Sequence, residues 1–219
     1  MARRRDRLEA LAAKIGRAQV IVVDLAAPRA PRKLIDAVHK QGLTVTTLLN
    51  KAGVGLAGRF AGLPSARQRE MIDLNIAALV ELTHLVLPGM LERREGGILN
   101  VASTAAFQPG PGFAVYFASK AFVLSFTEAL HQELKRTGVK VCALCPGPTR
   151  TEFGEVAGVT SAAFDKLAAD APTVVTAGLA GLARNRAVVI PGLTNKIGAQ
   201  SSRIIPRAAM RRIVASMKL

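Results

Sequence analysis

The amino-acid sequence predicts a doubly wound α/β fold, in which helices cover both faces of a parallel sheet. Short, nearly all-apolar segments typical of buried parallel strands alternate with segments of helical periodicity. Glycine turns follow several of these apolar segments, at the strand ends where open α/β sheets bind ligands. The chain has 219 residues, 50% of them hydrophobic, which is enough to bury one core. We therefore expect a single domain over residues 1–219.

The first elements follow this alternation. One helical face is predicted from apolar residues at i, i+3, i+4 and i+7, namely Leu8, Leu11, Ala12 and Ile15. The run QVIVVDL at residues 19–25 is predicted to be a buried strand. Next come a helix at residues 32–42, closed by a glycine, and a second buried strand whose segment, residues 43–53, ends in the glycine turn NKAG.

The alternation continues toward the C-terminus. We expect, in order, a helix at 69–94, a strand at 96–103, a helix at 116–138, a strand at 139–147 and a last strand at 187–190. The region 152–186 is less regular and is predicted to be helical beside a site. The tail, residues 198–219, places isoleucines and valines against arginines, which predicts a basic amphipathic helix interrupted at Pro206.

Composition narrows the class of protein. The net charge of +15 attracts polyanions, but a groove for single-stranded nucleic acid uses stacking aromatic rings, and the chain has no Trp and one Tyr. We expect no nucleic-acid partner. No apolar run reaches the ~20 residues that cross a bilayer, and Asp6 and Glu9 interrupt the basic start, so we expect a cytoplasmic protein. The basic tail leaves two alternatives open: packing against the body or a subunit partner, and peripheral contact with a membrane.

The only tyrosine, Tyr116, lies four residues before Lys120 in YFASK, so both side chains project from one face of a helix. A free tyrosine has a pKa of about 10, and a neighbouring ammonium group favours the phenolate. This pairing is expected to lower the tyrosine pKa toward the range useful for acid–base catalysis. The pair therefore predicts a proton-transfer site.

Two further polar residues strengthen this prediction. Ser103 ends the strand predicted at 96–103, and Asn75 lies in the middle of the long helix. Each has an ordinary alternative, because a serine after a strand often caps a helix and a mid-helix asparagine often faces water. Their combination with the glycine turns indicates a ligand site at the carboxyl ends of the strands.

These motifs, in this order along the chain, resemble those of the short-chain dehydrogenase/reductase family. The residues and segments that carry the resemblance are Asp24 and Leu25 after the first apolar run, the NKAG turn, Asn75, Ser103, Tyr116, Lys120 and PGPTRT at residues 146–151. The resemblance covers nearly the whole chain. It implies a Rossmann-like sheet and hydride transfer between a nicotinamide cofactor and a small carbonyl or alcohol substrate.

The resemblance also implies a role for each residue. Tyr116 would exchange a proton with the substrate oxygen, Lys120 would lower the Tyr116 pKa and hold the nicotinamide ribose, Ser103 would hydrogen-bond the substrate oxygen, and Asn75 would hold a water molecule beside Lys120. No metal site is implied. The cofactor-binding residues implied are Asp24, Leu25, Asn50, Ala52 and Gly53 on the adenosine side, and Lys120, Pro146, Gly147, Thr149 and Thr151 near the nicotinamide.

The chain departs from the family pattern at two places. Lys51 stands where the family has the second asparagine of an N-N-A-G turn, and lysine offers hydrogen-bond donors only. No Thr-Gly-x-x-x-Gly-x-Gly loop, which the family uses to bind the cofactor pyrophosphate, occurs in the sequence. The opening ARRRDRLEAL resembles the end of the family's second strand, where Arg3 or Arg4 would meet the 2′-phosphate of NADP. We therefore expect NADP in preference to NAD.

This comparison implies an N-terminal truncation. By analogy with a βαβ unit, about 30 residues are missing, comprising the first strand, the glycine-rich loop, the first helix and most of the second strand. The strand predicted at 19–25 would then lack its neighbour, and the chain as written should be a poor enzyme. Two hypotheses stay open: an NADP-dependent reductase whose true start lies upstream, and an inactive fragment that acts, if at all, through protein interaction.

A zinc deaminase is a weaker alternative. His131 and Glu133 with Cys142 and Cys145 echo the H-x-E and C-x-x-C motifs of such enzymes, but their spacing is wrong and VCALC reads as a buried strand. We interpret the two cysteines as buried free thiols, since two alone support no disulfide framework.

The substrate is only weakly constrained. The region 152–186, which covers the substrate in the family, has few charges and several apolar residues, which favours a moderately apolar ketone or alcohol. A second apolar stripe on the helix after Tyr116, formed by Phe122, Phe126 and Leu130, fits a contact with another subunit, as in many members of the family, or core packing equally well. We expect a homo-oligomer.

Overall fold

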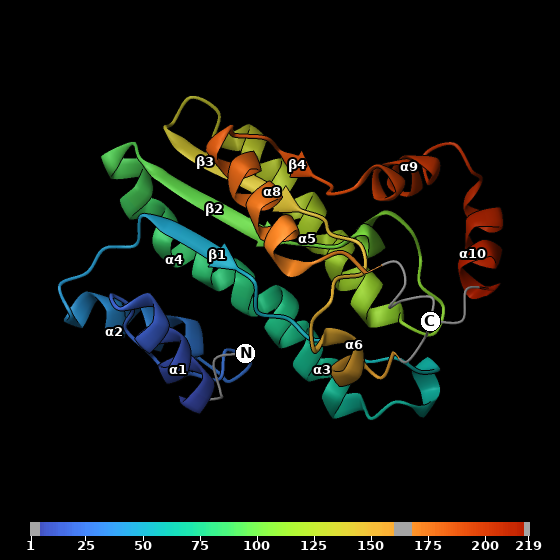
Figure 1. Ribbon diagram of the computed structural model, residues 1–219, viewed down its shortest axis with the longest axis horizontal. Helices are drawn as coiled ribbons and strands as arrows, with labels where there is room; N and C mark the ends of the chain where they lie inside the picture. The colour runs from blue at the N-terminus through green and yellow to red at the C-terminus, as the bar shows by residue number, and fades with distance from the viewer. Residues whose placement is uncertain (1–4, 160–167, 217–219) are drawn as a thin grey trace.

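The computed structural model describes residues 5–159 and 168–216 and contains a parallel sheet with helices on both faces (Figure 1). Four parallel strands in the described residues are hydrogen-bonded in the order β1-β2-β3-β4. Their bounds are Thr47–Asn50, Gly96–Val101, Val139–Leu144 and Val188–Val189. The predicted doubly wound α/β fold is confirmed.

The helices alternate with the strands along the chain. Their bounds are α1 Arg5–Ile15, α2 Ala30–Lys40, α3 Ser65–Ile72, α4 Ala78–Arg93, α5 Ala114–Glu133, α6 Phe153–Ala157, α8 Ala171–Ala183, α9 Leu193–Ser201 and α10 Arg207–Ser216. Short turns of 3-10 helix, η1 Phe60–Gly62 and η3 Thr104–Phe107, and the π-helical turn η2 Asp73–Ala77 complete the list.

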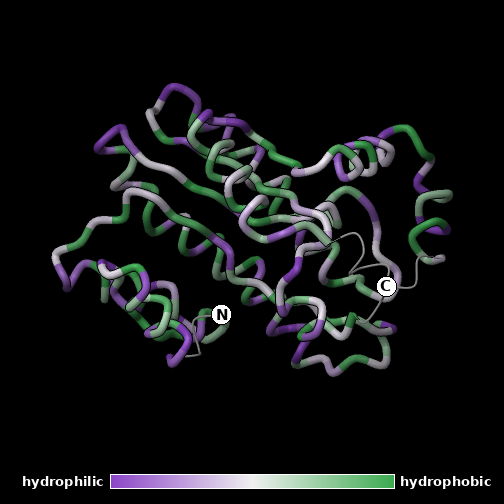
Figure 2. The backbone as a smooth tube through the Cα atoms, in the orientation of Figure 1, coloured by the Kyte–Doolittle hydropathy of each residue, from purple (hydrophilic) through white to green (hydrophobic). Residues whose placement is uncertain are grey.

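Alternate residues of the central strands face opposite helical layers, as the pleat of a strand requires. Ile98 and Val141 pack with buried residues of α4, whereas Leu99 and Cys142 pack with Val174 and Leu182 of α8. Figure 1 shows α8 in front of β2 and β3, with α4 and α5 behind the sheet. Hydrophilic residues are concentrated at the turns that precede β2 and β3 (Figure 2).

The long helix predicted at 69–94 is observed as α3, η2 and α4 in one continuous run, Ser65–Arg93. By length and mean hydropathy, 1.6 over its most apolar window, this run could cross a bilayer. Its apolar residues have another explanation, because Met71, Leu74, Leu82 and Met90 are buried in the core. The π-helical turn in its middle was not predicted, and it carries Asn75.

The strand predicted at residues 19–25 does not form: the prediction is wrong, and the segment has no regular structure. Within the described residues the sheet ends at β1, so no neighbouring strand offers backbone partners to this segment. The segment instead runs beside α1. Arg3 and Arg4, which were predicted to meet the cofactor, lie outside the described residues.

The C-terminal region follows the prediction more closely. Pro206 separates α9 from α10, as expected from the loss of a backbone donor at proline. Met210 and Val214 of α10 are buried in the same cluster as Phe113 and Phe117, so one face of α10 packs on the body. On α5, Phe122 is half-exposed and stacks on Phe126 with ring centroids 5.8 Å apart. A contact with another subunit through this stripe stays a prediction.

Candidate active site

Tyr116 and Lys120 lie one turn apart on α5, and both side chains are buried. The Lys120 Nζ atom donates a hydrogen bond to the Val101 carbonyl oxygen at the end of β2, 2.8 Å away. The same atom lies 5.8 Å from the centroid of the Tyr116 ring. The predicted pair therefore faces the carboxyl end of the central strands.

The pKa of Tyr116 differs in direction from the prediction. Burial raises it to about 12, while a hydrogen bond with the Ser103 side chain offsets part of this increase. Burial lowers the pKa of Lys120 to about 8. The expected lowering of the tyrosine pKa is wrong because burial of the phenol, which disfavours the phenolate, dominates the shift. At neutral pH, Tyr116 is accordingly a protonated phenol.

Ser103 lies two residues after the end of β2, and its side chain makes two hydrogen bonds. Its Oγ atom accepts a hydrogen bond from the Ala105 backbone N–H, 3.1 Å away, and so caps η3. It also donates to the carbonyl oxygen of Pro146, 3.4 Å away. The helix-cap alternative is therefore correct, but it does not remove Ser103 from the site, because the same side chain contacts Tyr116.

Asn75 is buried in η2 and does not face water. Its Oδ1 atom accepts from the Val54 N–H at 2.9 Å, and its Nδ2 atom donates to the Val54 carbonyl at 2.9 Å and to Ser119 Oγ at 3.1 Å. A β-carbon added at Gly53 would lie 3.2 Å from Asn75 Oδ1 and 3.5 Å from Lys120 Nζ. The glycine turn, the π-helical turn and α5 therefore meet at one point, where π-helical turns often mark functional sites.

Two phenylalanine rings form an aromatic wall around Tyr116. This packing was not predicted from the sequence. The Phe113 ring packs edge-on against the Tyr116 ring with centroids 5.1 Å apart, and the Phe153 ring of α6 lies 5.2 Å away. A β-carbon at Gly55 would lie 2.7 Å from Phe153 Cζ. Phe153 belongs to the region predicted to cover the substrate. The only sign of this close packing in the sequence is Gly55, which lies two residues after the NKAG turn and has no side chain to keep the ring away.

On the predicted adenosine side, Leu25, Asn50 and Ala52 line one small hollow together with residues of α4 and η2. Asn50 Nδ2 donates to Asn100 Oδ1, 2.9 Å away, so its amide is held by the sheet. Asp24 Oδ1 accepts a hydrogen bond from the Ala26 N–H, 3.2 Å away. The structure thus brings Leu25, Asn50 and Ala52 together beside η2 and α4, and Asp24 directly precedes Leu25.

The segment after β3 forms a loop beside the site. Thr149 Oγ1 donates to the Gly147 carbonyl oxygen, 3.0 Å away, and Thr151 Oγ1 donates to the Thr149 carbonyl oxygen, 3.4 Å away. A β-carbon at Gly147 would lie only 2.4 Å from Asn195 Oδ1 of α9. Asn195 was not predicted as a site residue, because nothing in the sequence places α9 against the Pro-Gly segment.

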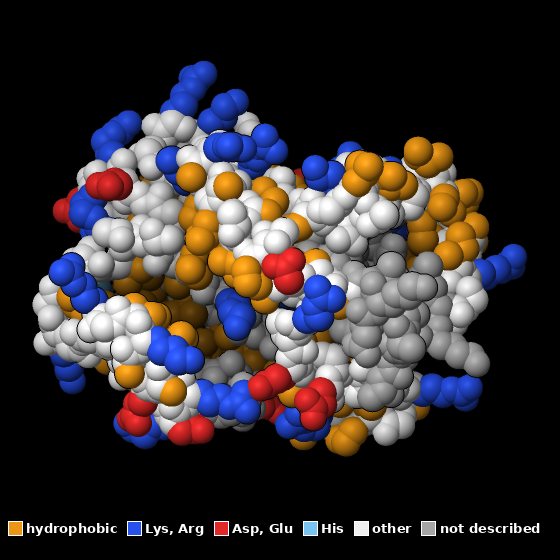
Figure 3. All heavy atoms as spheres, viewed as in Figure 1, with side chains coloured by type: hydrophobic (Ala, Val, Ile, Leu, Met, Phe, Trp, Pro, Cys, Tyr) orange, Lys and Arg blue, Asp and Glu red, His pale blue; other side chains and the backbone are white. Residues whose placement is uncertain are grey.

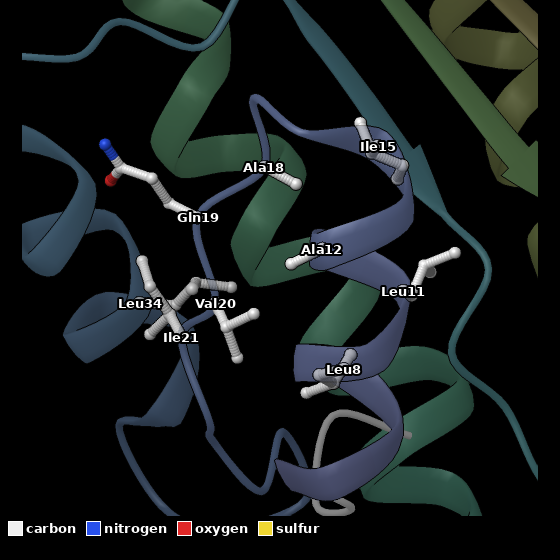
Figure 4. A pocket seen from close by; sticks show the side chains of 9 residues that line it. All are labelled: Leu8, Leu11, Ala12, Ile15, Ala18, Gln19, Val20, Ile21 and Leu34. Carbon is white, nitrogen blue, oxygen red and sulfur yellow. The ribbon is translucent and has the colours of Figure 1, made fainter.

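A separate hollow of about 280 Å³ lies away from Tyr116, between α1 and residues 18–21 (Figure 4). Its lining is almost entirely apolar and includes Leu8, Leu11 and Val20. The helical face predicted from Leu8 to Ile15 therefore faces this hollow. Since it contains no titratable side chain, the hollow offers no acid–base chemistry of its own.

The cysteine and histidine side chains of the zinc alternative do not converge. Cys142 packs toward α8, whereas Cys145 packs with Val123 and Leu124 of α5 on the opposite face of the sheet. His131 Nδ1 is 2.7 Å from the Val141 carbonyl oxygen. Burial raises the pKa of Cys142 to about 11 and that of Cys145 to about 12. Both are buried free thiols, as predicted.

Comparison with known proteins agrees with this geometry. Residues 1–160 match the family model described as short chain dehydrogenase. A sulfoacetaldehyde reductase from Chromohalobacter salexigens is 41% identical over 174 residues, which span 77% of this chain and 69% of that protein. A serine 3-dehydrogenase from Rhizobium radiobacter is 35% identical over 153 residues, 69% of this chain and 61% of that protein.

Solved structures show the same architecture. A short-chain dehydrogenase from Sphingobium yanoikuyae in complex with NADPH superposes with a TM-score of 0.79 at 28% identity, over 99% of this chain and 84% of its own. A 7β-hydroxysteroid dehydrogenase superposes with a TM-score of 0.86 at 24% identity, over 98% and 85%. Fold, relatives and family model together define an α/β oxidoreductase. The chain belongs to the short-chain dehydrogenase family.

Proposed function

We propose that this protein reduces a small carbonyl compound to an alcohol with a nicotinamide cofactor, with NADPH in preference to NADH. The observation that carries the proposal is the convergence of Ser103, Tyr116, Lys120 and Asn75 at the carboxyl end of β2. The preference for NADPH rests on Arg3 and Arg4 in the sequence and is supported by the NADPH complex of a structural relative.

The residues present fit the nicotinamide end of such a cofactor. One of the three N–H donors of Lys120 bonds the Val101 carbonyl oxygen, and the remaining ones suit ribose hydroxyl groups. Gly53 has no side chain to block the space beside Lys120 and Asn75. Thr149 and Thr151 would border the nicotinamide, and Asp24, Leu25, Asn50 and Ala52 the adenosine. When bound, the cofactor supplies a hydride to the carbonyl carbon.

In this proposal Tyr116 supplies the proton. Its raised pKa keeps the phenol protonated at neutral pH, so it can donate to the carbonyl oxygen as the hydride adds to the carbon. Ser103 would turn its one O–H from the Pro146 carbonyl oxygen to donate a second hydrogen bond to that substrate oxygen and hold it near Tyr116. Asn75, fixed on both sides by the Val54 backbone, would seat a water molecule that reprotonates the site through Lys120.

The wall around Tyr116 suggests the substrate class. Phe113 and Phe153 enclose the phenol from two sides, and no described charged side chain other than Lys120 is buried beside them. A charged substrate group packed against these two rings would lose its hydration, and the one buried charge beside them, Lys120, is already bonded to the Val101 carbonyl oxygen. We therefore expect a ketone or aldehyde whose carbonyl lies next to an apolar group.

The test combines binding and turnover in the 219-residue chain. Titration with NADPH and NADH, followed by cofactor fluorescence, measures affinity, and the oxidation of NADPH is then followed with a panel of apolar ketones and aldehydes. Tyr116→Phe should lower kcat by at least 100-fold, with NADPH affinity and melting temperature close to those of the unchanged chain. Retained turnover in Tyr116→Phe would refute the assigned proton donor.

One alternative has its own supporting observation. The sequence contains no Thr-Gly-x-x-x-Gly-x-Gly loop to bind a pyrophosphate, and the hollow beside Asn50 is far smaller than an adenosine. On this alternative the 219-residue chain is inactive and acts only through protein interaction. Absence of NADPH binding by the folded chain would support the alternative, and saturable NADPH binding would refute it.

A further inference from the structure

The C-terminal region exposes a line of large apolar side chains, here called the α9 stripe: Leu193, Ile197 and Ile204. Their side chains are 73%, 62% and 84% exposed. Leu193 and Ile197 are one helical turn apart, and the turn after α9 continues the helical path, since Ile204 N–H donates to the Ser201 carbonyl oxygen. At spacings of four and seven residues the three side chains share one side of the helix. Figure 3 shows hydrophobic side chains gathered over α9 and α10.

Core packing does not explain the α9 stripe. The side of α9 that faces the body carries Ala199, which is buried, and Asn195, which fills the space beside Gly147. On α10, the buried residues are Met210 and Val214. The stripe therefore points away from both contacts. A helix on the surface of a soluble protein normally has polar residues on that side, and a contiguous apolar surface normally marks an interaction site.

The stretch of sequence that carries the α9 stripe has charges of one sign only. Residues 171–219 contain no Asp or Glu, and they contain eight basic residues: Arg184, Arg186, Lys196, Arg203, Arg207, Arg211, Arg212 and Lys218. Lys196, Arg203 and Arg207 are exposed and lie next to the stripe in sequence. A partner for this surface must therefore accept apolar side chains and also bring negative charge.

A second copy of the chain could accept the apolar side chains but would not bring the negative charge. In a two-fold contact the same surface faces itself, so the basic residues of one copy would oppose those of the other with no acid of this region to pair with them. An anionic bilayer meets both requirements, because its headgroups carry negative charge and its acyl boundary accepts apolar side chains. We propose that the α9 stripe and its basic neighbours dock on an anionic lipid bilayer surface.

The test is flotation of the 219-residue chain with vesicles of phosphatidylcholine containing 30% phosphatidylglycerol, compared with vesicles of phosphatidylcholine alone. We expect binding to the anionic vesicles that weakens from 0.1 to 0.5 M salt. Lys196→Gln/Arg203→Gln/Arg207→Gln should reduce the partition coefficient about 100-fold, because each basic residue near such a surface contributes about 1 kcal/mol. Leu193→Ser/Ile197→Ser/Ile204→Ser should reduce binding at least tenfold.

A matched control replaces exposed apolar residues elsewhere. Phe60→Ser/Val175→Ser removes side chains that are 64% and 53% exposed on other surfaces and should bind vesicles as the unchanged chain does. Circular dichroism confirms that each variant is folded. The proposal would be overturned if Phe60→Ser/Val175→Ser lost as much vesicle binding as Leu193→Ser/Ile197→Ser/Ile204→Ser. It would also be overturned if the latter variant bound vesicles as well as the unchanged chain, or if the unchanged chain did not bind anionic vesicles. Sedimentation analysis showing a dimer that only the stripe variant dissociates would overturn it as well.

Discussion

Replacing Asn100 by leucine should strongly destabilise the fold. Asn100 is fully buried in β2, where it accepts a hydrogen bond from Asn50 Nδ2 and donates one to Thr127 Oγ1, each 2.9 Å long. Asn50 keeps only a longer contact to Thr83 Oγ1, at 3.3 Å, and Thr127 keeps its bond to the Val123 carbonyl oxygen. The change therefore removes two hydrogen bonds between buried groups on three elements.

The magnitude follows from these contacts. Two lost bonds at about 1 kcal/mol each, plus about 1–3 kcal/mol for the partner group left poorly satisfied, give about 3–5 kcal/mol. Since domains are stable by only ~5–15 kcal/mol, this is a large share of the free energy of unfolding. At about 2–4 °C per kcal/mol for a chain of this size, the melting temperature should fall by roughly 10 °C.

The assay is urea unfolding followed by far-UV circular dichroism, with Thr127→Val as the matched variant. Thr127→Val removes only one of the two bonds of Asn100 and should cost about 1–2 kcal/mol. In the double variant the shared bond is lost only once, so the combined cost should fall short of the sum by at least about 0.5 kcal/mol. Additive costs, or an Asn100→Leu chain as stable as the parent, would refute the argument.

Three further predictions follow from the same structure. Because burial lowers the Lys120 pKa to about 8 from 10.5, the unfolded chain binds more protons between these values, so the stability of the parent chain relative to Lys120→Met should rise with pH from about 8 to 10 in pH-dependent urea unfolding. From about pH 9 the raised pKa values of Cys142 and Cys145 lower the stability of both chains as pH rises, so the difference between the two chains isolates Lys120. Above pH 10 the raised Tyr116 pKa acts in the opposite direction. Gly147→Ala should destabilise the chain by about 1–3 kcal/mol through overlap with Asn195, and Asn195→Ala in the same chain should restore most of it in thermal melts. The two buried cysteines should react with a thiol reagent only at the rate of unfolding, and fast labelling of the folded chain would contradict their burial.

Much of the architecture could be predicted because burial leaves a local pattern. The near-continuous apolar runs at β2 and β3 are typical of strands covered on both faces, and the break at Pro206 follows from proline chemistry. The strand predicted at 19–25 failed for the converse reason. Its sequence is strand-like, but a strand also needs a neighbour for its backbone groups, and that requirement is not local.

The structure brings the predicted residues Ser103, Tyr116, Lys120 and Asn75 together, while their catalytic roles stay predictions. The order and spacing of Asn75, Ser103, Tyr116 and Lys120 identify the motif, whereas the π-helical turn that buries Asn75 leaves no sign in residue spacing. The direction of the Tyr116 pKa was wrong because the spacing of two residues along a helix does not reveal how deeply the tyrosine is buried, and burial dominates the shift. The contact of Asn195 with Gly147 joins segments far apart in sequence.

The contact between Asn195 and Gly147 restricts which residues can replace them during evolution. The side chain of Asn195 occupies the volume that a β-carbon at position 147 would need, so position 147 cannot gain a side chain while Asn195 is present. Among homologous sequences we expect the two positions to covary, with any larger residue at 147 accompanied by a smaller one at 195. Lys196 and Ile197 directly follow Asn195 on α9. Because Asn195 holds α9 against the loop that contains Gly147, that loop also fixes where the exposed residues of α9 lie.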